Sequence, residues 1–492
     1  MGSFNKNRSH QLVLIFKEPP TAAMARAMAV EPGSIESKMQ DIFQQENLFA
    51  KPLFPSISEG AMALKEFILD DRHERQLQEM GKFYHLRSES KDQLEKVKHR
   101  LEDLGVLSGA YYKPQSEPPA FFREKGHAGS LKKQGKTLKL TGDLSAKQVY
   151  LNPAPAGIDT AAAWALPGGR GADVNIIDIE GGWNFNHEDL QDNSRRLLSG
   201  INNTGDPDWF DHGTAVLGEM GGDANGKGVM GICPDAVIAT VSVYANEKMD
   251  FDTAGAIHFA ADSLAPGDII IIEQHRPGPN SPNADTQFGY IPIEWWPDDY
   301  LAILYATSKG IIVIEAAGNG AQDLDAAIYS QRPTNFPESW SNPFVRSEDR
   351  DSGAVLVGAG APPPGTHGQD WGTDRSRLDF SNYGTCVDTQ GWGEGVTTCG
   401  YGDIHGEDPQ DIKEWYTDSF AGTSSATPIV TGAVACLQGI RKAGGNPPLR
   451  PDQVRELLQK TGSPQQESSA APVSQRIGPR PDMKQLIKAI SF

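Results

Sequence analysis

Cysteine and long apolar runs are both scarce in this chain of 492 residues. No segment reaches the roughly 18 consecutive apolar residues that a membrane helix needs, so we expect no membrane partner. The first 20 residues contain a short apolar run, 12–16, followed by the charged residues Lys17 and Glu18. This run is too short for a secretory signal and is better interpreted as a strand. We therefore expect a cytoplasmic protein, or one secreted without a recognisable signal peptide.

None of the four cysteines belongs to a CxxC pair, which argues against zinc-finger and thioredoxin-like classes. Cys233 and Cys436 lie in apolar contexts that are typical of buried free thiols. Cys386 and Cys399 flank a glycine-rich loop. They are either paired, in an oxidising compartment, or two free thiols, and the sequence leaves both alternatives open.

Positive charge is in deficit, because the net charge is −19. Residues 1–150 hold 23 Lys+Arg and 19 Asp+Glu, which gives this part a net charge of +4. The remaining residues hold 22 Lys+Arg and 45 Asp+Glu, which gives them a net charge of −23. An acidic body argues against a nucleic-acid partner. The opposite signs favour docking of the N-terminal part on the body, although ordinary solubility charge explains the distribution equally well.

Residues 1–113 show a β-α-β-β-α-β pattern, which predicts a ferredoxin-like α+β domain. Strands are expected at 12–16, 48–54, 83–88 and 106–112, and the second of these at a sheet edge because Pro52 cannot donate to a ladder. Amphipathic spacing predicts helices over 34–45 and 91–105, and a helical insertion over 60–80. Residues 114–147 are polar and basic, and we interpret them as a linker.

From residue 148 onward the chain alternates between apolar runs and helical segments. The runs at 174–179, 236–244, 268–273, 310–317 and 354–360 are apolar on both faces, as buried parallel strands must be. Helices are expected over 253–265 and 298–310. The alternation predicts a doubly wound, mostly parallel α/β sheet with helices on both faces, occupying residues 148–492.

Four segments place chemically useful side chains where strands or helices end. Asp178 lies at the C-terminal end of an apolar strand, His212 lies in DHGTAVLG, Asn319 lies in AAGNG, and Ser424 opens the helix after FAGT. A serine that attacks a carbonyl needs a base, an acid that orients the base, and donors for the oxyanion. The positive end of the helix dipole at Ser424 suits such chemistry.

These four motifs, in this order, resemble those of the subtilisin-like serine peptidases, or subtilases. The resemblance covers about residues 148–492. It implies a serine endopeptidase in which Asp178, His212 and Ser424 form the catalytic triad and Asn319 supplies the oxyanion amide, with no cofactor required for the chemistry. Protein or peptide substrates and a monomeric enzyme are expected. The N-terminal domain resembles subtilase propeptides in topology, and we expect it to bind the catalytic domain and restrain it.

Two departures from the family pattern stand out. Ile179 and Glu180 replace the small residue and glycine that usually follow the acid, and the loop from Asp178 to HEDL is two residues longer. Bulky polar residues, 273–276, also replace the glycine-containing wall of the substrate cleft. An insertion at 277–300, rich in Trp, Tyr and Pro, is either a lid or substrate-contact loop, or a packed surface excursion.

The resemblance also implies a structural calcium site, at which Asp189 and Asn225 match two ligand positions. Oxygen ligands on a loop suit Ca²⁺. Two other functions remain open at this stage. The same triad in a peptide ligase or macrocyclase would pass the acyl group to an amine, and a catalytically silent subtilase-like module would only bind peptides.

Overall fold

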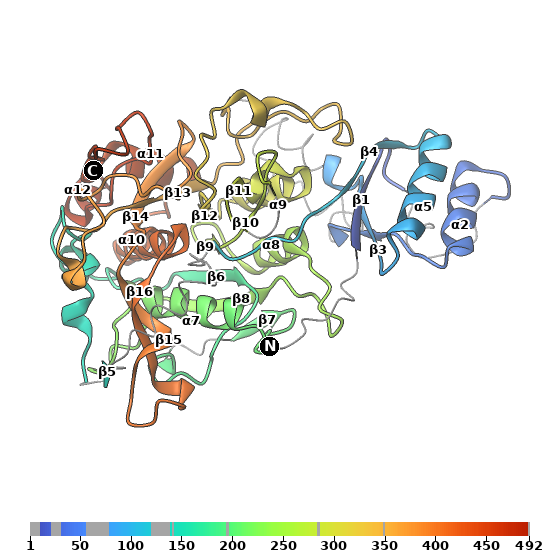
Figure 1. The fold of residues 1–492 in the computed structure, drawn as a ribbon. Helices are drawn as coiled ribbons and strands as arrows, with labels where there is room; N and C mark the ends of the chain where they lie inside the picture. The colour runs from blue at the N-terminus through green and yellow to red at the C-terminus, as the bar shows by residue number, and fades with distance from the viewer. Residues whose placement is uncertain are drawn as a thin grey trace.

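The computed structural model describes residues 10–20, 31–55, 78–119, 138–139, 142–192, 196–282, 286–347 and 350–490. A small N-terminal domain lies beside a larger α/β body, and the chain runs from one to the other through the segment 113–119, which is drawn as a loop and enters the body (Figure 1). No helix in these ranges is long and apolar enough to cross a membrane. Of the insertion expected at 60–80, only 78–80 fall in the described ranges, and they are helical.

The N-terminal domain has the ferredoxin-like arrangement that the sequence predicts. Its antiparallel sheet has the order β2-β3-β1-β4, with β2 at the edge. The strands and helices are β1 (His10–Phe16), α2 (Ile35–Gln45), β2 (Lys51–Pro52), β3 (Phe83–Ser88), α5 (Lys91–Asp103) and β4 (Leu107–Tyr112). Ser34 and Ser90 cap the two helices by accepting hydrogen bonds from backbone N–H groups.

The body is built on a seven-stranded parallel sheet of order β14-β13-β12-β9-β6-β8-β7. The doubly wound fold class is therefore confirmed. The strands are β6 (Asn175–Glu180), β7 (Leu197–Ser199), β8 (Val237–Ser242), β9 (Ile269–Ile272), β12 (Ile312–Ala316), β13 (Val355–Gly360) and β14 (Val387–Trp392).

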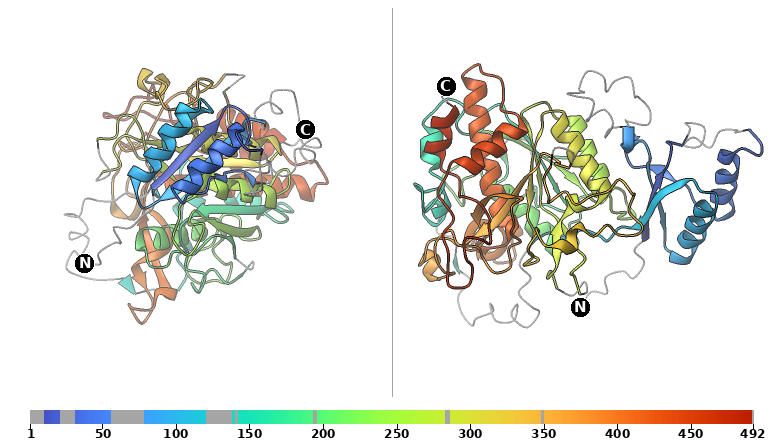
Figure 2. Two further views of the ribbon diagram at one scale, coloured as in Figure 1. Left: turned by 90° about the vertical axis from the view of Figure 1, so that its right-hand side faces the viewer. Right: turned by 90° about the horizontal axis from the view of Figure 1, so that it is seen from above.

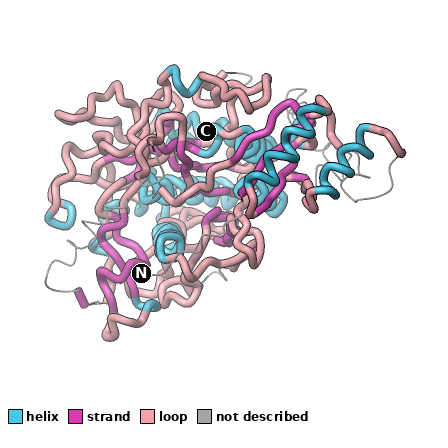
Figure 3. The backbone as a smooth tube through the Cα atoms, turned by 45° about the vertical axis from the view of Figure 1, so that its right-hand side comes forward, coloured by secondary structure: helices cyan, strands magenta, loops and turns pink. Residues whose placement is uncertain are grey.

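Helices cover both faces of this sheet, and Figure 3 shows them against the strands. One face packs on α6 (Thr160–Trp164), α7 (Pro207–Gly221), α10 (Thr423–Ala443), α11 (Pro451–Lys460) and α12 (Met483–Ile490), and the other on α8 (Thr253–Ser263) and α9 (Pro297–Ser308). Successive strand residues alternate between the faces. Ile269 and Ile271 accordingly join the core with α7 and α10, whereas Ile270 and Ile272 join the core with α8 and α9.

Two further sheets were not anticipated from the sequence. β15 (Val396–His405) and β16 (Trp415–Phe420) pair antiparallel, with β5 (Leu138–Lys139) beside β15. β10 (His275–Pro277) and β11 (Tyr290–Pro292) form a short antiparallel hairpin that begins just before the 277–300 insertion and ends within it. Polar residues and glycines interrupt these strands, so their apolar periodicity is weak.

The N-terminal sheet docks on the α8/α9 face of the body, with its own helices turned outward (Figures 1 and 2). Alternation along β1 explains this contact. Leu12 and Leu14 pack under α2 and α5, whereas Val13 and Ile15 join the core cluster that contains residues of α8 and α9. A strand buried on both faces must be apolar at every position, which is why 12–16 is a continuous apolar run.

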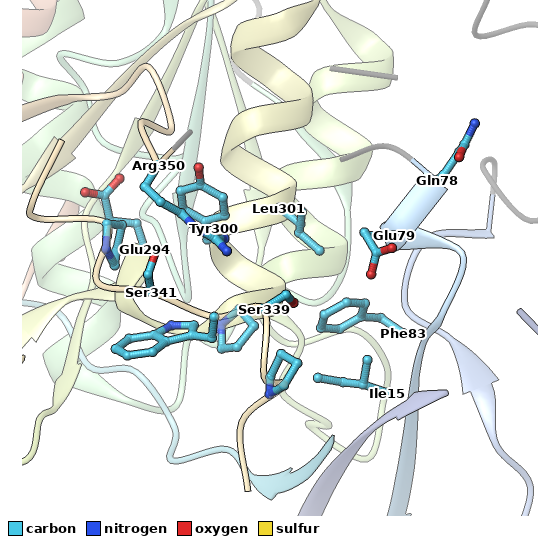
Figure 4. A pocket seen from close by; sticks show the side chains of 14 residues that line it. Ile15, Gln78, Glu79, Phe83, Glu294, Tyr300, Leu301, Ser339, Ser341 and Arg350 are labelled. Atoms are coloured by element: carbon cyan, nitrogen blue, oxygen red, sulfur yellow. The ribbon is translucent and has the colours of Figure 1, made fainter. Parts of the chain in front are cut away.

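Charged groups are buried at the same junction. Lys113 Nζ lies 2.5 Å from Asp298 Oδ2 and 2.6 Å from Asp299 Oδ1. Tyr111 donates to Asp298 at 2.6 Å, and Arg276 pairs with Asp299 at 2.9 Å. A cavity of about 390 Å³ also opens between the parts, with Ile15 and Phe83 on one side and Tyr300 and Leu301 on the other (Figure 4).

All four cysteines are buried, and none of them forms a disulfide bond. For Cys233 and Cys436 this confirms the expectation of buried thiols. Cys386 belongs to the core cluster of the α8/α9 face and Cys399 to that of the α7/α10 face. Of the two alternatives for this pair, the structure therefore has free thiols, because the sheet separates them.

Candidate active site

The candidate nucleophile lies at the start of the longest helix. Ser424 is the second residue of α10, directly after Thr423 and Gly422, and its side chain is buried. The first N–H groups of a helix have no partner in the preceding turn, so an oxygen near Ser424 meets unpaired donors and the positive end of the dipole. Gly422 has φ 119°, a conformation that strongly favours glycine.

His212 projects from α7, which packs beside α10. The helix begins after Asp206, whose side chain accepts from the Asp208 N–H, and His212 lies in its second turn. The imidazole ring is 5.5 Å from the ring of Phe420, centroid to centroid, just before the Ser424 motif. Its Nδ1 lies 2.6 Å from Glu180 Oε1, whereas Nε2 has no hydrogen-bond partner among the described residues. A histidine held at Nδ1 with Nε2 free is oriented as a general base.

The carboxylate beside His212 is Glu180, and this corrects the expectation for Asp178. Asp178 Oδ2 instead accepts from Trp183 Nε1 at 2.7 Å. Both carboxylates point to the α7 side of β6 because they are two residues apart on one strand. Glu180 is the last residue of the strand and therefore the nearer of the two to His212.

Two sequence signals pointed to Glu180. Glu180 is followed by Gly181 and Gly182, whereas Asp178 is followed by Ile179. Counting the loop to HEDL from Glu180 instead of Asp178 also removes the two extra residues. Both departures noted in the sequence therefore disappear when the motif is shifted by two positions.

Asn319 lies where the expected oxyanion donor should be, in the loop after β12. Its Oδ1 accepts from the Thr423 N–H at 2.9 Å and the Thr423 hydroxyl at 3.0 Å. These two donors hold the amide so that Nδ2 points into the cleft, where it lies 2.5 Å from the carbonyl oxygen of Pro119. The Ser424 Oγ lies 2.8 Å from the same oxygen. Asn319 and Ser424 thus converge on one carbonyl group.

That carbonyl belongs to the chain that leaves the N-terminal domain. Glu117 and His275 exchange backbone hydrogen bonds at 3.0 and 3.1 Å, so the segment 116–119 lies antiparallel to β10. Ser116 is buried, and its hydroxyl hydrogen-bonds the Gln274 side chain. Addition of a strand to an exposed edge is a common way for proteins to bind peptides. Residues 114–119 of the expected linker therefore occupy the cleft, and most of the rest lies outside the described residues.

The two ends of the 277–300 insertion have different contacts. Gln287 Nε2 donates to the Pro118 carbonyl at 3.0 Å, and the Tyr290 hydroxyl lies 3.4 Å from Glu117 Oε1. Trp295 and Trp296, in contrast, are buried in the core. The insertion therefore contacts the segment 116–119 at one end and is packed structure at the other.

Several carboxylates near His212 are buried. Burial raises the pKa of Glu180 well above its ordinary value, and it also raises that of Asp178, to which the Glu180 charge adds. Burial and the neighbouring Glu180 and Asp178 raise the pKa of Glu273. Burial lowers the pKa of His212 to about 3. The neutral forms are favoured while the segment 116–119 keeps water out of the cleft.

Other polar residues of the motifs have structural contacts. Asp211 accepts from the Tyr401 N–H at 3.3 Å and is not the partner of His212. His187 lies 2.7 Å from the Trp415 carbonyl oxygen, and Ser425 donates to the Trp392 carbonyl at 2.9 Å. These residues hold the loops around the site.

The two residues expected to bind calcium are adjacent. Asp189 is buried, and its carboxylate accepts from Asn225 Nδ2 at 2.9 Å and from the Val229 N–H at 2.7 Å. Asn225 Oδ1 accepts from the Lys227 N–H. Asn225 thus presents nitrogen to Asp189, and calcium binding requires this amide to rotate. No group of three or more His, Cys, Asp or Glu side chains within the described ranges is placed to hold a metal.

Comparison with known proteins agrees with the fold and the motifs. The sequence profile of the subtilase family, Peptidase_S8, matches residues 168–478. The chain therefore belongs to the subtilase family, and its class is that of the subtilisin-like serine endopeptidases.

Individual relatives are distant. An intracellular serine protease of Paenibacillus polymyxa is 25% identical over 330 residues, which cover 64% of this chain and 82% of that protein. A calcium-dependent protease of Nostoc sp. is 27% identical over 334 residues, 62% of this chain but only 44% of that protein. The structure of EpiP from Staphylococcus aureus, an epidermin leader peptide processing serine protease, superposes with a TM-score of 0.54 at 16% identity, covering 99% of both chains.

Proposed function

We propose that this protein hydrolyses peptide bonds with Ser424 as nucleophile, His212 as general base and Glu180 as the carboxylate that orients the base. The observation that supports this best is the Pro119 carbonyl, which lies between Ser424 Oγ and Asn319 Nδ2. A carbonyl held between a nucleophile and an amide donor is in the place of a bond about to be attacked.

The reaction follows from these contacts. Ser424 Oγ attacks the carbonyl carbon while His212 Nε2 takes the hydroxyl proton, and the oxyanion receives the hydrogen bond from Asn319 Nδ2. Glu180, at 2.6 Å from Nδ1, favours the tautomer with its proton on Nδ1 and stabilises the imidazolium as it forms. His212 then protonates the leaving amine, and water releases the acyl group by the same steps in reverse.

We also propose that the N-terminal domain restrains the enzyme. Its sheet packs on α8 and α9, and Lys113 anchors the chain at Asp298 and Asp299, directly before the segment in the cleft. While residues 116–119 remain paired with β10, another peptide cannot take the same edge. Removal of the segment by cleavage or displacement would open the site.

A calcium ion at Asp189 and Asn225 stays a prediction. It is supported by the calcium-dependent protease among the relatives and by the buried charge of Asp189. The ion would brace the loops around these residues and take no part in the chemistry.

The decisive experiment is labelling with a fluorophosphonate probe, followed by mass spectrometry of the products formed from a peptide mixture. We expect covalent label on Ser424 and new carboxyl termini. A site that remains unlabelled after the N-terminal domain is removed from the cleft would mean a binding module. Products joined through new amide bonds to added amines would mean a ligase.

A further inference from the structure

We infer that this site cleaves on the carboxyl side of proline, and that His275 restricts the pocket for the residue before the cut to compact side chains. The inference rests on the proposed function and adds the substrate class to it. Its starting point is that Pro119, and no other residue of the described segment, presents its carbonyl to Ser424 and Asn319. The bond to be cut is then Pro119–Ala120.

The pairing with β10 shows which way Pro119 points. Glu117 is opposite His275, so continuing the antiparallel register by two residues brings Pro119 opposite Glu273. Side chains that are paired or two residues apart lie on the same side of a ladder. Pro119 therefore lies on the side of His275, as does Glu117, whose carboxylate reaches the Tyr290 hydroxyl. Pro119 is itself buried.

On that side His275 fills the space between the two walls of the cleft. A Cβ added to Gly318 on the opposite wall would lie 3.2 Å from His275 Cβ and 3.3 Å from its Nδ1. The imidazole is buried, its ring lies 4.7 Å from that of Tyr290, and its Nδ1 accepts from the Asn319 N–H at 3.2 Å. Because Gly318, Tyr290 and Asn319 surround the ring, it cannot rotate to admit a large side chain. A pyrrolidine ring fits the room that is left.

Proline also suits the backbone contacts at this point. Beyond the bridge between Glu117 and His275, the described segment makes no further backbone hydrogen bond to β10, and residues 118 and 119 are both prolines without an N–H to donate. The insertion holds this stretch from the other side, through Gln287 and the Pro118 carbonyl. A peptide with Pro-Pro before the cut therefore leaves no buried donor unpaired.

The cleavage itself balances as an acyl transfer. Ser424 Oγ bonds to the Pro119 carbonyl carbon, the bond from that carbon to the Ala120 nitrogen breaks, and the nitrogen takes the proton that His212 received from Ser424. Water then hydrolyses the Pro119 ester, which restores Ser424 and leaves a proline carboxylate.

The test uses the full chain and its variants, with cleavage followed by intact mass. We expect the wild type to produce a new N-terminus at Ala120, and Ser424→Ala to produce none. Pro119→Ala should be cut more slowly than the wild type, because alanine brings an N–H that the cleft does not pair, and Pro119→Phe should slow the cut further, by roughly tenfold or more, as pocket contacts of this size allow. Adding His275→Gly to Pro119→Phe should restore the cut, because it opens the pocket. The rate of His275→Gly with the native Pro119 is the reference for the double variant, because loss of the imidazole also removes the acceptor of the Asn319 N–H.

A second measurement uses the processed enzyme with Ser-Glu-Pro-X p-nitroanilides, where X is Pro, Ala, Leu or Phe. Pro should have the highest kcat/KM, and Phe should gain most in His275→Gly. Equal cutting of Pro119→Phe and wild type, a cut at another bond, or turnover of Phe but not Pro would overturn the inference and leave the proposed function intact. Absence of any cut together with an unlabelled Ser424 would instead reject the proposed function.

Discussion

Two groups of buried carboxylates in this molecule differ in how their charge is compensated. At the junction of the domains, Asp298 and Asp299 contact Lys113, and Arg276 pairs with Asp299. Burial pushes the pKa of Asp298 up, but the charge and hydrogen bond of Lys113, together with Tyr111 and Arg276, outweigh it, so the net pKa lies below the ordinary value. For Asp299 burial outweighs the two cations, and its pKa stays raised.

On the opposite face of the sheet, Asp178, Glu180, Glu219 and Glu273 form no ion pair with Lys or Arg in the part of the chain that the structure describes. Burial raises the pKa of each of them. A buried acid without a cation is costly to keep charged and is retained where chemistry uses it, whereas a paired acid serves to join two surfaces. The predictions below test this difference between a reactive group and a docking group.

The largest effect is expected at the nucleophile. Ser424→Ala should lower kcat by roughly 10⁴-fold or more, because only the attacking oxygen is removed. Peptide turnover should be compared with the far-ultraviolet circular dichroism of the same variant, which should be unchanged. Near-normal turnover would show that another group carries the reaction.

The next largest effect is expected for the carboxylate of β6 that contacts His212. Glu180→Gln should lower kcat by about 10³ to 10⁴, because a neutral amide neither fixes the tautomer of His212 nor stabilises its cation. Asp178→Asn is the matched control, since Asp178 contacts Trp183 and not His212, and it should lose less than about tenfold. The reverse ranking in steady-state assays would restore Asp178 as the triad acid.

Loss of the oxyanion donor should have a smaller effect. Asn319→Ala should lower kcat by roughly 10² to 10³ with little change in KM, because the hydrogen bond strengthens only as charge develops. Thr423→Val removes one of the two donors that hold the Asn319 amide and should cost less than Asn319→Ala. A raised KM at constant kcat would make Asn319 a binding residue.

At the junction, breaking the ion pair should affect stability and docking. Lys113→Met leaves Asp298 and Asp299 short of a cation, and loss of one partner of a buried pair costs about 3 to 5 kcal/mol. In a Ser424→Ala background, we expect a lower melting temperature and faster hydrogen exchange in β1 to β4. Lys460→Met, which removes an exposed pair with Glu456, should change stability by less than about 1 kcal/mol. Equal effects of the two would mean that Lys113 does not anchor the domain.

The last effect concerns pH and calcium, and it is spread over about three pH units. Burial raises the pKa of Asp189 to about 7, although the Val229 N–H partly offsets this. Between about pH 4 and 7 the folded chain then holds a proton that the unfolded chain releases, so stability falls as pH rises, by up to about 4 kcal/mol. Thermal melts of Ser424→Ala in chelator should show this slope. Asp189→Asn should remove this dependence of stability on pH. Calcium added to the protein that keeps Asp189 should do the same. A slope that both changes leave intact would exclude Asp189 as its source.

Much of this protein follows from its sequence by itself. The apolar runs such as DIIIIE predicted buried parallel strands because every position of such a strand meets a core, and β1 was predictable for the same reason. The motifs around His212, Asn319 and Ser424 were recognisable because local glycines and helix starts place those side chains.

Asp178 and Glu180 could not be separated by periodicity, since residues two apart on a strand share a face. Only the tertiary structure shows that Glu180 is the one beside His212, because reach to His212 depends on where β6 ends relative to α7. The position of the segment 116–119 in the cleft also depends on the tertiary structure. Nothing local marks 116–119 as a strand, since its two prolines donate no hydrogen bonds, and it pairs with β10 only because Lys113 and the docked domain deliver it there.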